Sequence, residues 1–154
     1  MYKSKGIELT SLWRPVNNFN IGLNYSYTDT YDGADCDNPN QGSSLTVKSI
    51  DCAMVRVPRH ALNSSINYKT KNNINSKLMI KYSGEVRDYG NTNNSFADQI
   101  LDDYITFGYF ADYKFKDTYK IYFEANNIFD QNYEQAYQYS TLGRSFNIGF
   151  RKEY

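Results

Sequence analysis

The stretch YKIYFEANNIFDQNYEQAYQYSTLGRSFNIGFRKEY, which runs from Tyr119 to Tyr154, decides the fold. Its last segment alternates between apolar and polar side chains, and only Lys152 interrupts the pattern. The apolar positions are Phe146, Ile148, Phe150 and Tyr154, and the polar positions are Ser145, Asn147, Arg151 and Glu153. Alternation with a period of two predicts a β-strand with one apolar face. That face either packs on a second sheet, as in a soluble sandwich, or contacts lipid, as in a transmembrane barrel.

Six earlier segments alternate in the same way. They span residues 6–14, 19–31, 61–69, 74–87, 103–115 and 119–127. Short turns at 15–18, 70–73 and 116–118 alternate with long polar connections at 32–59, 88–102 and 128–143. In a meander, every short turn then lies at one end of the sheet and every long loop at the other. Strands of roughly ten residues with this asymmetry are typical of outer-membrane barrels, whose short turns are periplasmic and whose long loops are extracellular.

The sequence therefore predicts an all-β, antiparallel transmembrane β-barrel meander of seven strands. On this interpretation the C-terminus lies on the short-turn side, in the periplasm. Bacterial single-chain barrels have an even number of strands, and open edges in lipid leave backbone groups without hydrogen-bond partners. Either the chain contains one more strand than the alternating pattern indicates, or the barrel continues upstream of Met1. Two alternatives stay open: a small stand-alone barrel with an eighth strand, and a soluble extracellular sandwich that serves as an adhesin.

Composition limits the classes of partner. The chain has 154 residues with 17 basic and 17 acidic side chains, so its charge gives no reason to expect nucleic acid as a partner. Aromatic residues make up 17% of the sequence, a share that favours membrane interfaces as well as strands in general. Mean hydropathy is −0.72, and the lack of a run of about 18 apolar residues excludes a transmembrane helix. A transmembrane barrel can have a low mean hydropathy and no long apolar run, because only alternate residues contact lipid.

Four stretches of the sequence resemble the C-terminal part of TonB-dependent outer-membrane receptors. They are KGIELTSLWRP (5–15), FNIGLNYSYTDT (19–30), VPRHALNSSINY (57–68) and EANNIFDQNYEQAYQYSTLGRSFNIGFRKEY (124–154). The last of them, with Asn127-Ile128-Phe129-Asp130, Tyr133 and the run from Tyr137 to Arg144, is most similar to cobalamin receptors. The resemblance extends over nearly the whole chain.

This resemblance implies a barrel of about 22 strands, an N-terminal plug domain and a short segment that engages TonB in the periplasm. Residues 1–154 would supply the last seven strands, and the plug domain and the TonB-coupling segment are expected to be absent from this chain. The implied function is uptake of a scarce nutrient across the outer membrane of a Gram-negative bacterium. Cobalamin is the expected ligand, and a siderophore-iron complex is the alternative. No catalysis is implied.

The resemblance also implies a set of partners. Through the full-length receptor, they are TonB and a periplasmic binding protein, together with outer-membrane lipid and lipopolysaccharide. The barrel-assembly machinery would recognise a C-terminal signal formed by Phe146, Ile148, Phe150 and Tyr154. Tyr154 stands where the family usually has Phe, and this position remains aromatic.

The expected substrate-binding residues are Tyr137, Tyr139 and Arg144, in the last long connection. Aromatic side chains give a large, flat ligand contact area at a small entropic cost. Bracing of the loop is the alternative role for both tyrosines. Four arginines near the long-loop ends suit an anionic substrate or lipopolysaccharide phosphates, although solvated loop charges are the more ordinary interpretation: Arg56, Arg59, Arg87 and Arg144.

Both cysteines, Cys36 and Cys52, fall in the first long connection. In an oxidising extracellular compartment they are expected to form a disulfide. It would close a loop of about 17 residues and contribute roughly 3 kcal/mol in the chain-entropy model.

The same connection begins with a dense acidic run. Asp32, Asp35 and Asp37 supply hard oxygen ligands that suit calcium, which some cobalamin receptors use to order their substrate loops. The run lacks the bidentate Glu of an EF-hand loop, and a solvated loop is the alternative. Calcium is the only cofactor that the sequence suggests.

His60 and Ser64 are the residues that would prompt a hydrolase hypothesis. No carboxylate is placed to orient the histidine, and no nucleophile elbow surrounds the serine. The sequence therefore predicts that the protein is not an enzyme.

Overall fold

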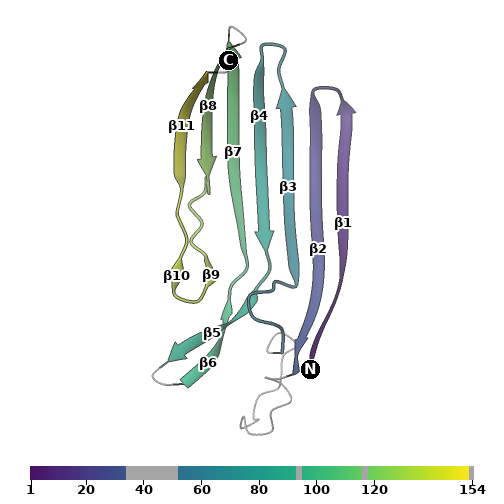
Figure 1. The fold of residues 1–154 in the computed structure, drawn as a ribbon, viewed down its shortest axis with the longest axis vertical. Helices are drawn as coiled ribbons and strands as arrows, with labels where there is room; N and C mark the ends of the chain where they lie inside the picture. Colours follow the sequence, from purple (N-terminus) through teal and green to yellow (C-terminus); the bar gives the residue numbers. More distant parts are fainter. Residues whose placement is uncertain (34–51, 93–94, 116–117, 153–154) are drawn as a thin grey trace.

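The fold is a single antiparallel sheet of seven strands that follow one another in space as they do along the chain (Figure 1). The computed structural model describes residues 1–33, 52–92, 95–115 and 118–152. The strands of the sheet are β1 (Tyr2–Val16), β2 (Phe19–Asp32), β3 (His60–Lys69), β4 (Ile74–Ser83), β7 (Tyr104–Phe115), β8 (Tyr119–Asn126) and β11 (Ser145–Lys152). The predicted all-β antiparallel meander is thereby confirmed. Within these ranges, no helix has the length and apolarity to span a membrane.

The strand register places the apolar parity of every strand on one face. Tyr25 of β2 lies opposite Leu9 of β1 and Leu62 of β3. Farther along the sheet, Ile80 pairs with Phe107, and Phe123 with Ile148. Side chains on directly opposite residues contact one another, so these pairs form a continuous apolar surface across all seven strands.

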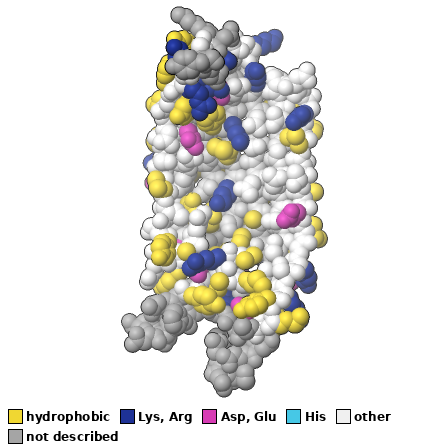
Figure 2. Space-filling model, viewed as in Figure 1, with side chains coloured by type: hydrophobic (Ala, Val, Ile, Leu, Met, Phe, Trp, Pro, Cys, Tyr) yellow, Lys and Arg dark blue, Asp and Glu magenta, His cyan; other side chains and the backbone are white. Residues whose placement is uncertain are grey.

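The opposite face is polar. Asn24 lies opposite Thr10 and Asn63, and Lys81 lies opposite Thr106. Figure 2 shows one face of the sheet on which hydrophobic side chains are sparse over the middle of the strands and Lys and Arg side chains are scattered. The apolar face is therefore suited to contact with lipid and the polar face to contact with water.

The apolar face carries no second layer among the described residues. Ile148 is 80% exposed and Ile7 is 70% exposed, and the few buried hydrophobic residues lie mostly near the ends of strands. Exposed apolar surface of this extent is unfavourable in water, by about 25 cal/mol for each Å². Among the described residues the sheet is therefore not one layer of a sandwich, and its exposed apolar face fits a wall in contact with lipid.

All long loops lie at one end of the sheet and all short turns at the other (Figure 1). The short turn between β3 and β4 is closed by hydrogen bonds from the Thr70 amide to the Ile74 carbonyl and from the Ile74 amide to the Thr70 hydroxyl. Asn73 occupies the left-handed region at φ 60°, which Asn tolerates better than most residues. The N-terminus lies at the long-loop end, and β11 ends at the short-turn end.

Aromatic rings form a row on the apolar face at the short-turn end. Phe115 stacks on Tyr113 and Tyr119, with ring centroids 6.0 and 5.5 Å away, and Tyr119 stacks on Phe150 at 5.6 Å. At the long-loop end, Tyr27 packs on His60 at 5.2 Å. Aromatic residues at both ends of an apolar band are characteristic of a wall that crosses two membrane interfaces.

The structure differs from the sequence prediction in the loops. The segment predicted to continue to residue 87 ends at Ser83, and the polar connection after it contains a hairpin formed by β5 (Val86–Thr92) and β6 (Ser95–Leu101). A smaller hairpin, β9 (Glu134–Ala136) with β10 (Tyr139–Ser140), lies in the last long connection. The first strand also begins earlier than predicted, because Tyr2 to Lys5 pair with Asp29 to Asp32.

The two edges of the sheet are β1 and β11, which do not pair with each other. The sheet is therefore open, as expected for an odd number of barrel strands.

Candidate functional site

The loops at the long-loop end are held together by one buried carboxylate, that of Asp88 in β5. Its side chain is 0% exposed. Asp88 Oδ1 accepts hydrogen bonds from Arg56 Nε at 2.9 Å and from the Tyr89 amide at 2.8 Å. Asp88 Oδ2 accepts one from the Tyr137 amide at 2.7 Å. Asp88 thus joins the segment after Cys52, the β5–β6 hairpin and the β9–β10 hairpin.

The ionised form of Asp88 is favoured at this position. Burial raises the pKa of the carboxyl group, but the hydrogen bonds from Tyr137, Arg56 and Tyr89 and the charge of Arg56 outweigh burial, so the pKa is lowered from its ordinary value. Hydrogen bonds that a carboxylate accepts stabilise its charge. Asp88 is therefore charged at neutral pH.

Arg87 provides a second connection between the same segments. Its side chain is 1% exposed, and its Nη1 donates to the Ala53 carbonyl at 2.8 Å. The Arg87 carbonyl accepts a hydrogen bond from the Arg56 amide at 2.8 Å. The segment after Cys52 is therefore fixed to β5 at two residues, Ala53 and Arg56.

The predicted substrate-binding tyrosines lie in the β9–β10 hairpin. Tyr137 is partly buried and is anchored by its amide to Asp88, whereas Tyr139 is 74% exposed. Gln138 between them has a φ of 63°, and its amide donates to a carboxylate oxygen of Glu134. The hairpin therefore presents an aromatic side chain to solvent from a backbone that is tied down.

The structure does not bring Arg144 to these tyrosines. The Arg144 amide donates to Asp130 Oδ1 at 2.7 Å, and its guanidinium lies 3.5 Å from the Ile128 carbonyl. Asp130 belongs to a turn in which Asn127 binds Gln131 through both its amide nitrogen and its oxygen, each at 2.9 Å. Arg144 thus lies where the loop rejoins the sheet, and its contacts brace the base of the loop.

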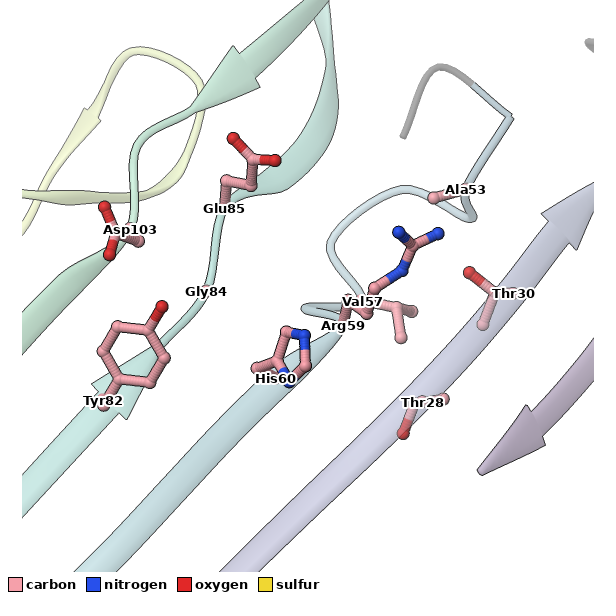
Figure 3. A pocket seen from close by; sticks show the side chains of 10 residues that line it. All are labelled: Thr28, Thr30, Ala53, Val57, Arg59, His60, Tyr82, Gly84, Glu85 and Asp103. Carbon is pink, nitrogen blue, oxygen red and sulfur yellow. The ribbon is translucent and has the colours of Figure 1, made fainter. Parts of the chain in front are cut away.

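A cavity of about 490 Å³ lies where β3 begins, between β2 and the end of β4 (Figure 3). Arg59 Nη2 pairs with Asp29 Oδ1 at 3.0 Å, and Lys5 lies 3.4 Å from the other oxygen of Asp29. The Tyr82 hydroxyl points to the side of the cavity that carries Glu85 and Asp103. The arginine that seemed suited to an anionic ligand is thus already paired with a carboxylate.

The residues that prompted the hydrolase hypothesis have other partners. His60 Nδ1 lies 2.8 Å from the Tyr25 hydroxyl, and the Ser64 hydroxyl donates to the Gly22 carbonyl at 3.0 Å. His60 and Ser64 therefore form no nucleophile–base pair.

A larger cavity of about 690 Å³ lies against the polar face. Asn24, Asn63, Lys77 and Lys81 contribute to its wall. Tyr133 also lines it, and its ring stacks on that of Tyr104 at a centroid distance of 4.0 Å. In the part of the chain that the structure describes, neither lysine has a carboxylate within ion-pair distance. This wall is polar, cationic and partly aromatic.

Several predicted site residues lie outside the described residues: Cys36, Asp35, Asp37 and Tyr154. Cys52, the predicted disulfide partner of Cys36, accepts a hydrogen bond at its carbonyl oxygen from the Asp32 amide at 2.8 Å. Asp32, the remaining member of the predicted calcium site, is buried at the end of β2. No group of three metal-ligating side chains occurs among the residues with a described position. The disulfide and the calcium site stay predictions.

The other three residues of the predicted C-terminal signal lie on the apolar face of β11. Phe146, Ile148 and Phe150 are all exposed. They lie opposite Ala125, Phe123 and Ile121 of β8.

The site residue that the sequence did not reveal is Asp88. It falls in a polar connection, and its partners Arg56 and Tyr137 are 32 and 49 residues away. No local spacing signals such a contact. Arg56 and Arg87, which the sequence suggests as contacts for an anionic ligand, are both engaged within the loop cluster.

Comparison with known proteins identifies the family. Residues 1–128 match the model for "TonB dependent receptor-like, beta-barrel". A search of curated proteins finds no match.

Solved structures share the fold. The siderophore receptor PiuA from Acinetobacter baumannii is 24% identical, with a TM-score of 0.73 over 99% of this chain and 22% of its own. The ferric yersiniabactin uptake receptor FyuA from Yersinia pestis is 19% identical, with a TM-score of 0.74 over 99% of this chain and 24% of its own. The ferric-catecholate import receptor Fiu from E. coli K12 is 14% identical, with a TM-score of 0.75 over 98% of this chain and 21% of its own.

The chain thus spans between a fifth and a quarter of the length of these three receptors. Its single sheet, with one apolar and one polar face, is the part of a barrel wall that such a span would supply. From the match over residues 1–128, the chain belongs to the TonB-dependent receptor β-barrel family, whose members are outer-membrane transporters and not enzymes.

Proposed function

We propose that this chain forms the C-terminal part of the barrel of an outer-membrane receptor that imports iron bound to a siderophore. The rest of the receptor would provide the remaining strands, the plug domain and the segment that engages TonB. The relatives reported above are named as siderophore or ferric-complex receptors, which supports iron over other nutrients.

The observation that carries the proposal is the polar-face cavity beneath the long loops. The hollow measures about 690 Å³ against this part of the wall, and the rest of the receptor would complete its lining. Lys77 and Lys81 lack carboxylate partners among the described side chains, so the wall attracts negative charge. Siderophores bind ferric iron through anionic oxygen atoms, and their complexes suit a wall of ammonium, amide and tyrosine groups.

Cobalamin is the second candidate ligand. It rests on the resemblance of residues 124–154 to cobalamin receptors, whereas none of the structures reported above is named as a cobalamin receptor. The iron-siderophore hypothesis is therefore preferred. A calcium ion bound by Asp32, Asp35 and Asp37 is proposed only together with the cobalamin alternative.

The partners follow from the same proposal. TonB and a periplasmic binding protein would act through the complete receptor, and the barrel-assembly machinery would act on its C-terminal strand. The C-terminus and the short turns would be periplasmic, and the Asp88 loop cluster would be extracellular.

The test is uptake by cells that express the complete receptor in a strain without other iron-siderophore receptors. Radiolabelled ferric complexes of catecholate, hydroxamate and mixed-ligand siderophores are supplied separately, with radiolabelled cobalamin in parallel. We expect uptake of at least one ferric complex that is lost in an isogenic strain lacking TonB. Uptake of cobalamin alone would overturn the iron proposal, and uptake that does not depend on TonB would indicate a passive pore.

A further inference from the structure

We propose that Asp88 is a positioning residue, which holds the β9–β10 hairpin so that Tyr137 and Tyr139 form a fixed platform for the ligand. The ligand part of this inference rests on the proposed function. The anchoring part rests only on the geometry of the loop cluster, so the two can be tested separately.

The first step of the argument is burial. A carboxylate that is 0% exposed costs free energy unless its charge is fully compensated. Two of the three groups that donate to Asp88 belong to other loop segments, Arg56 and Tyr137, and the third is the amide of the next residue, Tyr89. The charge is therefore fully compensated only when both of the other segments are in place.

The second step concerns the hairpin itself. β9 has three residues and β10 has two, too few to hold a hairpin in water on their own. Its outside contacts include the bond from the Tyr137 amide to Asp88 Oδ2 and a side-chain bond from Gln135 to the Tyr104 hydroxyl at 3.2 Å. The bond to a charged, buried acceptor is the stronger of the two. Tyr133 and Gln135 fix the start of the hairpin to Tyr104. Asp88 fixes its turn at the Tyr137 amide.

The third step concerns binding. Tyr139 is exposed, and Tyr137 is held next to the Arg56–Asp88 pair. An aromatic platform that is ordered before the ligand arrives loses less entropy on binding. Release of the hairpin should thus weaken ligand binding even though Asp88 itself, being buried, touches no ligand.

Asp88→Asn is the informative substitution because it preserves volume and removes one acceptor. One end of an amide is an NH₂ donor. In one orientation of the substituted amide, this NH₂ group would face the Tyr137 amide. In the flipped orientation it would face Arg56 Nε and the Tyr89 amide, so two donors meet in either case. Glu8→Gln, which changes an exposed carboxylate in β1, at the other edge of the sheet from β11, is the matched control.

The anchoring is tested by hydrogen exchange with mass spectrometry on the complete receptor in detergent. We expect peptides that cover residues 134–141 to exchange about tenfold faster or more in Asp88→Asn than in wild type, and unchanged exchange in Glu8→Gln. Unchanged exchange in Asp88→Asn would overturn the proposal. If that variant does not show the heat-modifiable migration of a folded barrel, Arg56→Gln takes its place, with a smaller increase expected.

Positioning is separated from a general structural effect by a double-mutant cycle on binding of the ferric siderophore that supports uptake. We expect Asp88→Asn to weaken binding about tenfold in the wild-type background, and much less when Tyr137 and Tyr139 are both alanine. Equal losses in the two backgrounds would overturn the positioning role. A wild-type receptor that binds no ferric siderophore would instead contradict the proposed function, and hydrogen exchange would still decide whether Asp88 anchors the hairpin.

Discussion

The imidazole Nδ1 of His60 lies 2.8 Å from the hydroxyl oxygen of Tyr25, one strand away on the apolar face. The His60 ring also packs on Tyr27, with centroids 5.2 Å apart. The single histidine of the chain, at the start of β3, therefore contacts two tyrosines of β2. A tyrosine that has its hydroxyl satisfied and its ring against apolar neighbours is well placed at a membrane interface.

Replacement of His60 by alanine is expected to lower the free energy of unfolding by about 1 kcal/mol, because a ring contact and a hydrogen bond are both lost. Uptake of the ligand should be unchanged. Unfolding in urea with lipid vesicles measures the first effect, and cell-based uptake measures the second. A large loss of uptake with unchanged stability would contradict this role.

Replacement of Gly149 by alanine is expected to destabilise the last strand pair. The added methyl group would overlap the ring of Tyr122, which lies opposite in β8. Displacing the ring should cost about 1–3 kcal/mol. Gly22→Ala is the control, because its methyl group would meet only the Ser65 hydroxyl, at 3.2 Å, and that side chain can rotate. Equal stability of the two variants would show that the Tyr122 ring moves at no cost.

The loop cluster should open in acid. The pKa of Asp88 is lowered in the folded protein from an ordinary value of 3.8. Its contribution to stability is therefore fully present above that value and is lost as pH falls through the lower, folded-state pKa. We expect pepsin to cut the loops of the wild-type receptor more rapidly only near the acid end of a series from about pH 5 to pH 2. The Asp88→Asn receptor should be cut readily throughout the series, and a parallel rise in both proteins would exclude Asp88 as the cause.

Replacement of Lys81 by glutamine is expected to weaken binding of an anionic ferric complex several-fold and to reduce the dependence of binding on salt. Removing one charge from the wall of the polar cavity lowers its attraction for anions. Lys71→Gln, in the turn at the other end of the sheet, provides the control. Titration at low and high ionic strength gives both quantities, and a loss that is the same at every salt concentration would argue against an electrostatic role.

The predicted disulfide between Cys36 and Cys52 gives a direct chemical test. Without reduction, neither thiol of the mature receptor should react with an alkylating reagent, and both should react after reduction. Mass spectrometry of the peptides that contain the two cysteines measures this. Replacing both by serine should make the first long loop more sensitive to protease, since a closed loop of this size is worth about 3 kcal/mol. Alkylation before reduction would disprove the disulfide.

The seven strands could be predicted from the sequence because each strand carries its own alternating pattern. The exceptions have local explanations. Lys152, on the apolar parity, pairs with Tyr119 at the short-turn end, where a lysine can extend its amine toward water. Leu12, on the polar parity of the edge strand β1, lies opposite Gly22 of β2.

The hairpins and the loop cluster could not be predicted in this way. β5 (VRDYGNT) is mostly polar, and the apolar residues of β6 (SFADQIL) fall on both parities, so neither strand shows a clear alternation. Their position depends on contacts such as Arg87 with Ala53 and Asp88 with Tyr137, which join residues far apart in the sequence. For the same reason the sequence suggested Tyr137 and Tyr139 by residue type, but gave no indication of what holds them.

The strand register has a consequence for how this gene can change. Deleting a single codon within a strand such as β7 would turn every side chain beyond the deletion to the opposite face, placing Lys114 in lipid and Tyr113 in the lumen. Deleting two codons would leave every remaining side chain on its own face of the sheet and shorten the strand by two residues. Length differences between descendants of this gene should therefore occur in pairs of residues within the seven strands, and in any number within the long loops.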